Sequence, residues 1–481
     1  MAIRTGFSVA LVAGALSVWA PCVWAQEAPP APAAGDQPAP AAGDQPAPSP
    51  HAGGFWDRDL LTGDWGGLRT DWENHGVLLG SDYIGETLGN PTGGVHQGAI
   101  YEGRLELFIT LDLEKIAGWS GATVHANAYQ IHGRGLSANN LGNNILIASG
   151  IEASRSTRLF DLWLEQQLWN NMVAVRIGQL AADDEFIISQ YASLFVNSTF
   201  GFPGILATDL PSGGPEYPLS TPGVRVKVQP TDQLSFLAAL FNGDPAGRGP
   251  GNPQSRDPSG TAFRVNDDAF TIAEAAYALN QEKDATGLPG TYKLGGWYHS
   301  GQFADQRFDS AGLSLANPLS SGVPAQRRGD YGLYAVIDQL IWRMPETKDQ
   351  GLGAFLRLSG SPSDRNQVDL YADGGVNYKG LVPSRGDDVL GLGLAYAHIS
   401  GAASALDRDT NFFTGTNRPV RDYEAAIELT YRAQITAWWT IQPDLQYIFH
   451  PAGHVPDPTD PTHTHPIGDA LVVGVRTGIA F

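Results

Sequence analysis

The chain has 481 residues, of which 50 are Asp or Glu and 30 are Lys or Arg, so its formal net charge is −20. This acidic balance excludes the clustered Lys and Arg of a nucleic-acid-binding surface. No apolar run after residue 25 approaches the roughly 20 residues that a membrane-spanning helix needs, so any crossing of a membrane would have to be made by strands. A chain of this length has room for two ordinary domains or for one large all-β barrel.

Residues 1–25 have the pattern of a secretory signal peptide. Arg4 supplies the positive charge, Phe7 to Trp19 form the apolar core, and small residues precede Gln26. We therefore expect cleavage after Ala25 and export from the cytoplasm. The only cysteine, Cys22, would be removed with this segment, so the mature chain is expected to contain no disulfide.

Residues 26–54 are rich in Pro and Ala, and one eight-residue sequence occurs twice, from Pro30 to Gln37 and from Pro38 to Gln45. Such a composition cannot bury a core and predicts a flexible, extended tether. Residues 55–76 follow as an N-terminal periplasmic segment, in which Leu68 and Trp72 are spaced for one face of a short helix.

The stretch from Tyr101 to Leu113 alternates between apolar and polar residues, with Phe108 as an exception on the polar face. Leu105, Leu107 and Ile109 fall on one face, and Arg104 and Glu106 fall on the other. Period two predicts a strand with one apolar face. The pattern fits a barrel wall between lipid and water, but a soluble β-sandwich could show it as well.

Similar segments recur to the end of the chain, and their spacing favours the barrel. Tight turns, such as Trp169 to Met172, tend to follow even-numbered segments, and long connections, such as Leu180 to Thr221, tend to follow odd-numbered ones. An outer-membrane barrel with long external loops and short periplasmic turns has this parity. We count about sixteen segments: Val77–Thr87, Tyr101–Leu113, Ala122–His132, Leu159–Trp169, Met172–Gln179, Val224–Gln229, Leu234–Asn242, Phe270–Leu279, Tyr292–Ser300, Tyr331–Asp338, Leu352–Ser359, Asp369–Tyr378, Val389–His398, Tyr423–Arg432, Thr440–His450 and Ala470–Phe481.

The last segment alternates from Leu471 onward and finishes on Phe481, which looks like the closing strand of an outer-membrane barrel. The predicted fold class is therefore all-β, a transmembrane antiparallel β-barrel of about 16 strands over residues 77–481. The prediction places the barrel in the outer membrane of a Gram-negative bacterium.

Four ordered motifs stand out along the chain: Leu61–Arg69, Gly103–Leu107 running on to Ala117–Gly121, Ala181–Phe186 and Tyr292–Tyr298. Together they resemble one family, the carbohydrate-selective outer-membrane porins of the OprB type. The similarity runs from about Phe55 to Phe481. It implies a sixteen-stranded barrel through which monosaccharides and polyols diffuse passively.

The period-two register also predicts which polar residues line the pore. Guanidinium donors and carboxylate acceptors together can replace water around a sugar hydroxyl without favouring an ion, and an aromatic ring such as Trp163 can cover the apolar face of a pyranose. Each charge could instead belong to a salt-bridge ladder that stiffens the wall. The predicted substrate-binding residues are Arg104, Glu106, His125, Asn127, Asp161, Trp163, Glu165, Arg176, Asp183, Asp184 and Glu185.

The last three of these residues lie in the connection from Leu180 to Thr221, which is too long for an ordinary loop and is expected to fold inward at the constriction. Asp183, Asp184 and Glu185 would then place negative charge at the narrowest point. An exposed, solvated loop is the other interpretation of this acidic triplet.

We expect no catalytic residues, no cofactor and no metal. The carboxylate pair Glu424 and Glu428 belongs to a repeating polar ladder rather than to a glycosidase site. The histidines near the last external loop, His450, His454, His463 and His465, could ligate zinc or copper, but an exposed flexible loop is the favoured interpretation.

The predicted function is a carbohydrate-selective porin with a mixed-charge, aromatic-lined constriction. Its partners would be small neutral sugars, outer-membrane lipid and the barrel assembly machinery, with no nucleic acid. Two alternatives remain open at this point: a general or cation-preferring porin, favoured by the net charge of −20, and a secreted glycan-binding protein or glycosidase. The sequence does not indicate the oligomeric state.

Overall fold

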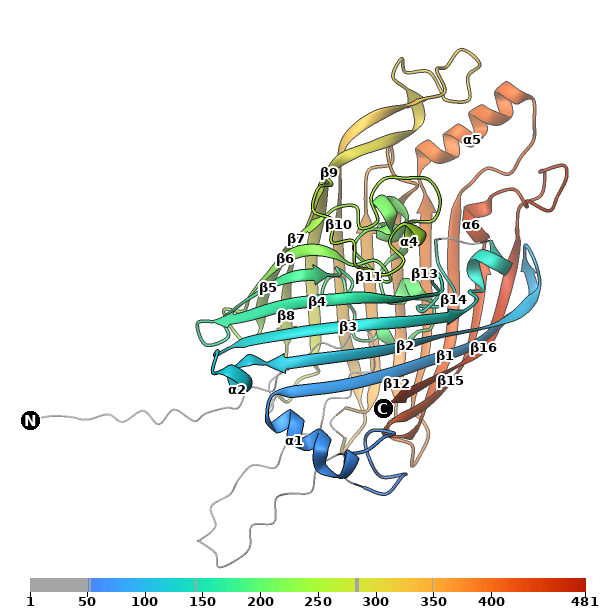
Figure 1. The fold of residues 1–481 in the computed structure, drawn as a ribbon. Coiled ribbons are helices and arrows are strands. Elements are labelled where there is room, and N and C mark those ends of the chain that lie inside the picture. Colours follow the sequence, from blue (N-terminus) through green and yellow to red (C-terminus); the bar gives the residue numbers. More distant parts are fainter. Residues whose placement is uncertain (1–50, 52, 143–144, 282–284, 348) are drawn as a thin grey trace, which may run out of the picture.

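The computed structural model describes residues 51, 53–142, 145–281, 285–347 and 349–481. The expected signal peptide and most of the expected tether lie outside these residues. In the described part, sixteen antiparallel strands close into one barrel, in which each strand pairs with its neighbours in sequence and β1 pairs with β16 (Figure 1). The strands are β1 (Val77–Gly94), β2 (Gly98–Asp112), β3 (Ala122–Gly133), β4 (Ser156–Leu168), β5 (Val173–Leu180), β6 (Thr221–Val228), β7 (Leu234–Asn242), β8 (Ala269–Leu279), β9 (Gly290–Asp309), β10 (Pro324–Arg343), β11 (Gly351–Gly360), β12 (Val368–Lys379), β13 (Val389–Ile399), β14 (Tyr423–Thr436), β15 (Trp439–Phe449) and β16 (Gly468–Ala480).

The helices are short and lie between strands or before the first one. None of those in the described part of the chain is long and apolar enough to span a membrane. They are α1 (Leu68–Asn74), α2 (Leu113–Ala117), α3 (Gly204–Asp209), α4 (Pro253–Arg256), α5 (Gly401–Thr414) and α6 (Pro451–His454), with shorter turns η1 (Trp65–Gly67), η2 (Ser137–Leu141), η3 (Ala192–Leu194), η4 (Ser198–Phe200) and η5 (Pro211–Gly213).

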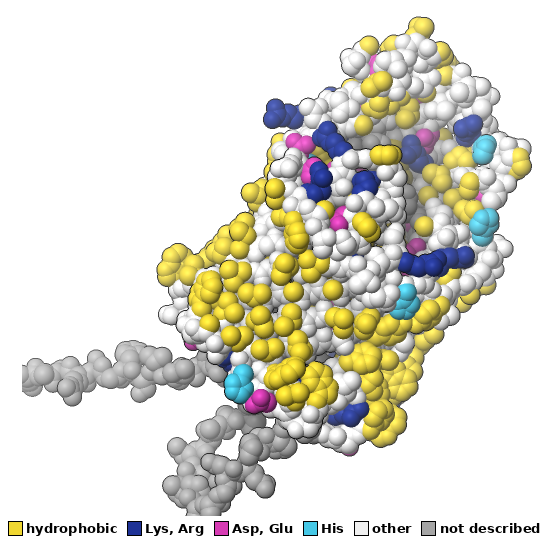
Figure 2. All heavy atoms as spheres, viewed as in Figure 1, with side chains coloured by type: hydrophobic (Ala, Val, Ile, Leu, Met, Phe, Trp, Pro, Cys, Tyr) yellow, Lys and Arg dark blue, Asp and Glu magenta, His cyan; other side chains and the backbone are white. Residues whose placement is uncertain are grey.

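The apolar and polar residues that alternate in the sequence lie on opposite faces of the barrel wall. On β2, Leu107 is 54% exposed and points outward, whereas its neighbour Glu106 is 1% exposed and points into the lumen. The same contrast recurs around the barrel, and hydrophobic side chains cover the visible outer wall (Figure 2). This confirms the predicted all-β barrel and its strand order, because one face must meet an apolar medium and the other must satisfy polar groups.

Two of the long connections contain regular structure. The connection between the predicted strands that end at Ser300 and begin at Tyr331 is mostly a hairpin, because β9 and β10 run on to Asp309 and Pro324. Buried Asp305 holds the two strands together by accepting from Arg327 at 2.6 Å. The connection after β13 contains α5, whose N-terminus is capped by Ser400 through the backbone N–H of Ala403 at 3.3 Å.

The two ends of the barrel differ in their connections. The turn end has short links such as 169–172 and 437–438, and the loop end has long ones such as 134–155 and 181–220. The 95–97 connection at the loop end is an exception to the predicted parity. α1 lies at the turn end (Figure 1), where buried Arg69 in this helix donates to the carbonyl of Phe481 at 3.0 Å.

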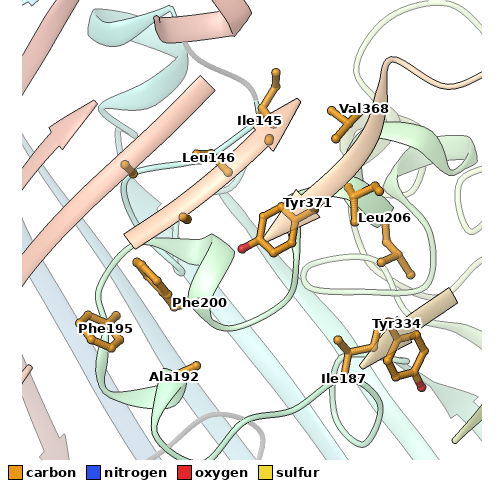
Figure 3. Packing of buried hydrophobic residues seen from close by; sticks show 14 of the residues in the cluster. Ile145, Leu146, Ile187, Ala192, Phe195, Phe200, Leu206, Tyr334, Val368 and Tyr371 are labelled. Atoms are coloured by element: carbon orange, nitrogen blue, oxygen red, sulfur yellow. The ribbon is translucent and has the colours of Figure 1, made fainter. Parts of the chain in front are cut away.

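The hydrophobic core lies inside the barrel rather than between layers. Residues 181–220, called the inward loop below, fold into the lumen and pack with residues 145–155 against the inner wall. Tyr371 and Val368 from β12 and Tyr334 from β10 meet side chains of these two segments (Figure 3). The apolar residues of the loop therefore fill space that polar wall residues alone would leave to water.

Small residues on β13 make room for this packing. Gly391 and Gly393 face the inward loop, and a Cβ on Gly393 would lie 2.8 Å from Cζ of Phe200 and 3.0 Å from Cε1 of Phe195. Those two rings are themselves 4.5 Å apart between centroids. The glycines therefore set how closely the loop approaches the wall.

Charged side chains on the wall bind the loop backbone. Arg357 on β11 pairs with Asp373 and donates to four carbonyls of the inward loop at 2.8 to 3.2 Å. On β14, Glu428 accepts from the backbone N–H groups of Val196 at 2.6 Å and Asn197 at 2.9 Å. A loop inside a barrel has few other partners for its backbone groups, and unpaired ones would be costly.

Replacing Gly393 by Ala tests the close approach of the loop. The added methyl group would press on Phe195 and Phe200, so we expect the free energy of unfolding to fall by about 1 to 3 kcal/mol. The matched control is Gly360→Ala, where the nearest atom lies 3.6 Å from the added Cβ. Urea titration of the detergent-folded protein measures both variants. Equal stability of the two would contradict the packing argument.

Replacing Arg357 by Met tests the anchoring of the loop backbone. The substitution leaves Asp373 as an unpaired buried charge and removes four loop contacts, so we expect a loss of about 3 to 5 kcal/mol in the free energy of unfolding. It should also increase proteolysis within 181–220. The double variant Arg357→Met/Asp373→Asn should recover part of the stability, because no buried charge remains unpaired. A single variant as stable and protease-resistant as the wild type would contradict this role.

Candidate functional site

The residues predicted to bind substrate come from neighbouring strands and from the start of the inward loop. They lie side by side because sequential strands are also spatial neighbours. β2 supplies Arg104 and Glu106, β3 supplies His125 and Asn127, β4 supplies Asp161, Trp163 and Glu165, β5 supplies Arg176, and the inward loop supplies Asp183, Asp184 and Glu185.

Four charged side chains form the centre of this region, and we call them the four-charge cluster. Arg176 contacts Glu165 at 3.0 Å and Glu185 at 3.1 Å. Arg225 on β6 contacts Glu165 at 2.6 Å and Glu185 at 2.5 Å. Each arginine therefore pairs with both glutamates, and the formal charges of the cluster cancel.

The cluster keeps a small exposed edge. The side chains of Glu165 and Glu185 are 14% and 12% exposed, and that of Arg176 is 10% exposed. Behind it lies a cavity of about 10 Å³, room for roughly one water molecule. A sugar ring cannot enter this cavity, so a permeating solute would meet only the exposed edge.

Aromatic rings hold one member of the cluster in place. The Arg176 guanidinium lies 3.8 Å from the ring centroid of Trp163. His125 stacks on Trp163 at 5.0 Å and contacts the Thr110 hydroxyl at 2.8 Å. Trp163 is 7% exposed, so in this structure it positions Arg176 more directly than it offers a free face to a sugar.

A second group surrounds Arg104. Its guanidinium lies 4.6 Å from the ring centroid of Tyr129 and 5.4 Å from that of Tyr217, and it approaches the Glu106 carboxylate at 3.7 Å. Glu106 accepts from the Asn127 amide at 2.9 Å. Asn127 accepts in turn from the backbone N–H of Asp161 at 2.7 Å.

The acidic triplet of the inward loop contains carboxyl groups whose pKa values are shifted in opposite directions. Burial, with the nearby Asp184, raises the pKa of Asp183 to about 8. Burial and the adjacent Asp161 raise the pKa of Asp184 well above its usual value. Burial acts in the same direction on Glu185, but Arg176 and Arg225 outweigh it and hold its pKa below the usual value. The local environment therefore favours the charged form most at Glu185.

The substrate-binding residues predicted from the sequence did not include Arg225, Tyr129 or Tyr217. Tyr129 shares the period-two face of His125 and Asn127, so the register could have found it. Nothing in the sequence brings Tyr217 of the inward loop to Arg104. The inward position of Phe160 was also not predicted. The pairing of β3 with β4 shifts register between Ala126 and Ala128, and as a result Phe160 and its neighbour Asp161 are both buried.

The carboxylates of Glu424 and Glu428 accept hydrogen bonds from the backbone of the loops. Glu424 accepts from the backbone N–H of Leu146 at 2.9 Å, and Glu428 holds the inward loop as described above. Both are therefore engaged in binding backbone groups, which does not fit a glycosidase pair. Among the described residues, the one group with metal-ligating geometry is Asp422, His450 and His454, away from this site at the loop end.

Comparison with known proteins agrees with the barrel and its lumen. The chain is 27% identical to Porin B of Pseudomonas aeruginosa over 435 residues, which cover 88% of this chain and 91% of that protein. It is 24% identical to the putative porin QuiX of Acinetobacter baylyi over 474 residues, which cover 89% and 95% of the two chains. The high-pH structure of Pseudomonas putida OprB superposes with a TM-score of 0.78 at 25% identity, and the match covers 89% of this chain and all of that one.

The family model for the carbohydrate-selective porins of the OprB family matches residues 96–481. This match spans β2 to β16, including every strand and loop residue of the candidate site. The family and the fold indicate a channel rather than an enzyme. The chain belongs to the carbohydrate-selective porin family OprB.

Proposed function

We propose that this porin lets monosaccharides and related polyols diffuse passively across the outer membrane, past a constriction formed by the four-charge cluster and the inward loop. The observation that carries the proposal is the cluster itself. Two arginines and two glutamates lie within hydrogen-bonding distance on the inner wall, and one of the glutamates belongs to the loop that fills the lumen.

The chemistry of the cluster suits a neutral, hydroxylated solute. Guanidinium groups donate hydrogen bonds and carboxylates accept them, so adjacent hydroxyls of a sugar can exchange water for both kinds of partner. The paired charges cancel, which gives neither ion sign an advantage. The small exposed edge allows only brief contact, as conduction requires weak binding.

The barrel and its family indicate the outer membrane of a Gram-negative bacterium. Within this setting we propose that the loop end faces outward and that residues 55–76 lie on the periplasmic side, after cleavage of the signal peptide at Ala25. The apolar outer wall would contact membrane lipid, and β16 would be presented to the barrel assembly machinery during insertion.

A general or cation-preferring porin remains the second candidate, because the whole chain carries a net charge of −20. The two functions differ in a measurable way. A cation-preferring pore would show a strong reversal potential in a salt gradient and no block by sugar, whereas the proposed sugar porin would show weak ion selectivity and a saturable fall of current with glucose.

The experiment is planar-bilayer conductance of the purified protein, titrated with glucose, for charge-unbalanced variants of the cluster. Arg176→Met/Arg225→Met leaves two negative charges and should shift the pore toward cations, whereas Glu165→Gln/Glu185→Gln leaves two positive charges and should shift it toward anions. Both should weaken glucose block at least tenfold, since one hydrogen bond to a charged group contributes about 1.5 to 3 kcal/mol.

Two controls separate the cluster from general effects of charge. Arg307→Met removes an arginine near the loop end of β9 that pairs with Asp409 of α5 at 2.8 Å, and it should leave glucose block unchanged. The quadruple variant of the cluster should have the ion selectivity of the wild type but not its glucose block. Unchanged glucose block in both double variants would contradict the proposed constriction.

A further inference from the structure

A cluster of one carboxylate and two imidazoles lies at the loop end, outside the sugar path proposed above. Asp422 directly precedes β14, His450 directly follows β15, and His454 ends α6. One potential ligand atom from each lies within 4.8 Å of the other two. Nδ1 of His450 is 2.9 Å from Oδ1 of Asp422, and Nδ1 of His454 is 3.4 Å from Oδ2 of the same carboxylate.

We propose that Asp422, His450 and His454 bind one divalent transition-metal ion of the zinc class. Two neutral imidazoles and a carboxylate are a common donor set for such an ion. Donor atoms about 2 Å from a tetrahedral zinc ion lie about 3.4 Å from one another, and the two separations between imidazole and carboxylate, 2.9 and 3.4 Å, are close to this value. The fourth ligand would be water, because the three side chains are 25 to 43% exposed.

The cluster is carried by a backbone segment of unusual conformation. His450 (φ 49°), Ala452 (φ 56°) and His454 (φ 73°) all adopt left-handed conformations, which residues other than glycine rarely adopt and which cluster at functional sites. The three residues Pro451, Ala452 and Gly453 between the histidines are buried. The side chains of His450 and His454 are 25% and 29% exposed, so both are partly buried.

Gly453 fixes the segment against the barrel rim. Its φ is 75°, and a Cβ there would lie 2.7 Å from the side chain of Ile399 at the end of β13. Its carbonyl accepts from the backbone N–H of Asp422 at 3.2 Å. The backbone that carries the two histidines is thus hydrogen-bonded directly to the residue that supplies the carboxylate.

The neighbouring charged groups leave the Asp422 carboxylate facing the imidazoles. Arg421, the adjacent residue, pairs with Asp407 through two contacts at 2.8 and 2.9 Å. The Asp469 carboxylate accepts from the backbone N–H of His450 at 2.9 Å, which helps to orient that residue. The rings of His450 and His454 stack at 4.1 Å between centroids, so both present Nδ1 to the same carboxylate.

The His-x-His pair in the same connection provides a matched comparison. His465 contacts Asp460 at 3.0 Å, and its side chain is 80% exposed. His463 and His465 are not part of the three-residue cluster. An ion bound by the cluster would join the connection after β13 to the connection after β15, because Asp422 ends the first and the histidines begin the second.

The test is isothermal titration calorimetry of zinc chloride into the full mature chain, folded in detergent, prepared without a histidine tag and stripped with EDTA. We expect one zinc ion per chain. Asp422→Asn and His454→Ala should each weaken binding at least tenfold, since even a change outside the ligand set typically costs about 10- to 100-fold. His463→Ala/His465→Ala should bind zinc like the wild type.

A second measurement distinguishes a variant that no longer binds the ion from a variant that no longer folds. Hydrogen exchange of residues 450–467 should slow when zinc is added to the wild type and to the His463→Ala/His465→Ala variant, and it should not change in His454→Gln. Two results would overturn the proposal: no zinc binding by the folded wild type, or binding that survives His454→Gln and Asp422→Asn but is lost in the His463→Ala/His465→Ala variant.

Discussion

The structure depends on one constraint: a loop placed inside a barrel must find hydrogen-bond partners for its backbone there. Arg357 and Glu428 meet this requirement from two different strands, one donating to carbonyls and the other accepting from N–H groups. Many of the charges that line the lumen are therefore structural. A lumen charge in a porin cannot be taken as a solute contact until its loop partners are known.

The four-charge cluster is a second place where the inward loop is bound to the barrel wall, here through side chains. Three of its members belong to the wall, but Glu185 belongs to the inward loop, so the position of that loop decides whether the arginines are fully paired. The inward loop therefore links two features of the lumen. Arg357 and Glu428 bind its backbone, and its Glu185 balances the charges of the four-charge cluster.

At the loop end, the cluster of Asp422, His450 and His454 is also held in place by the backbone around it. There the connections extend beyond the strands, and the rim of the wall still supplies partners such as Asp469 of β16, which accepts from the backbone N–H of His450. Left-handed residues and buried small side chains hold two histidines beside one carboxylate. An ion at this place would add to the contact between two connections.

The sequence alone determined the approximate strand number, their order and the face on which most side chains lie, because period-two alternation is a local property of each strand; Phe160, at a register shift in β4, is an exception. It also placed Arg104, Glu165 and Arg176 in the lumen, since strands that follow one another also pair. Only the tertiary structure decided that Arg225 completes the cluster, that Tyr217 covers Arg104 and that burial raises the pKa of Asp183 and Asp184. Those properties depend on where the inward loop packs, and long-range packing leaves no periodic signal in the chain.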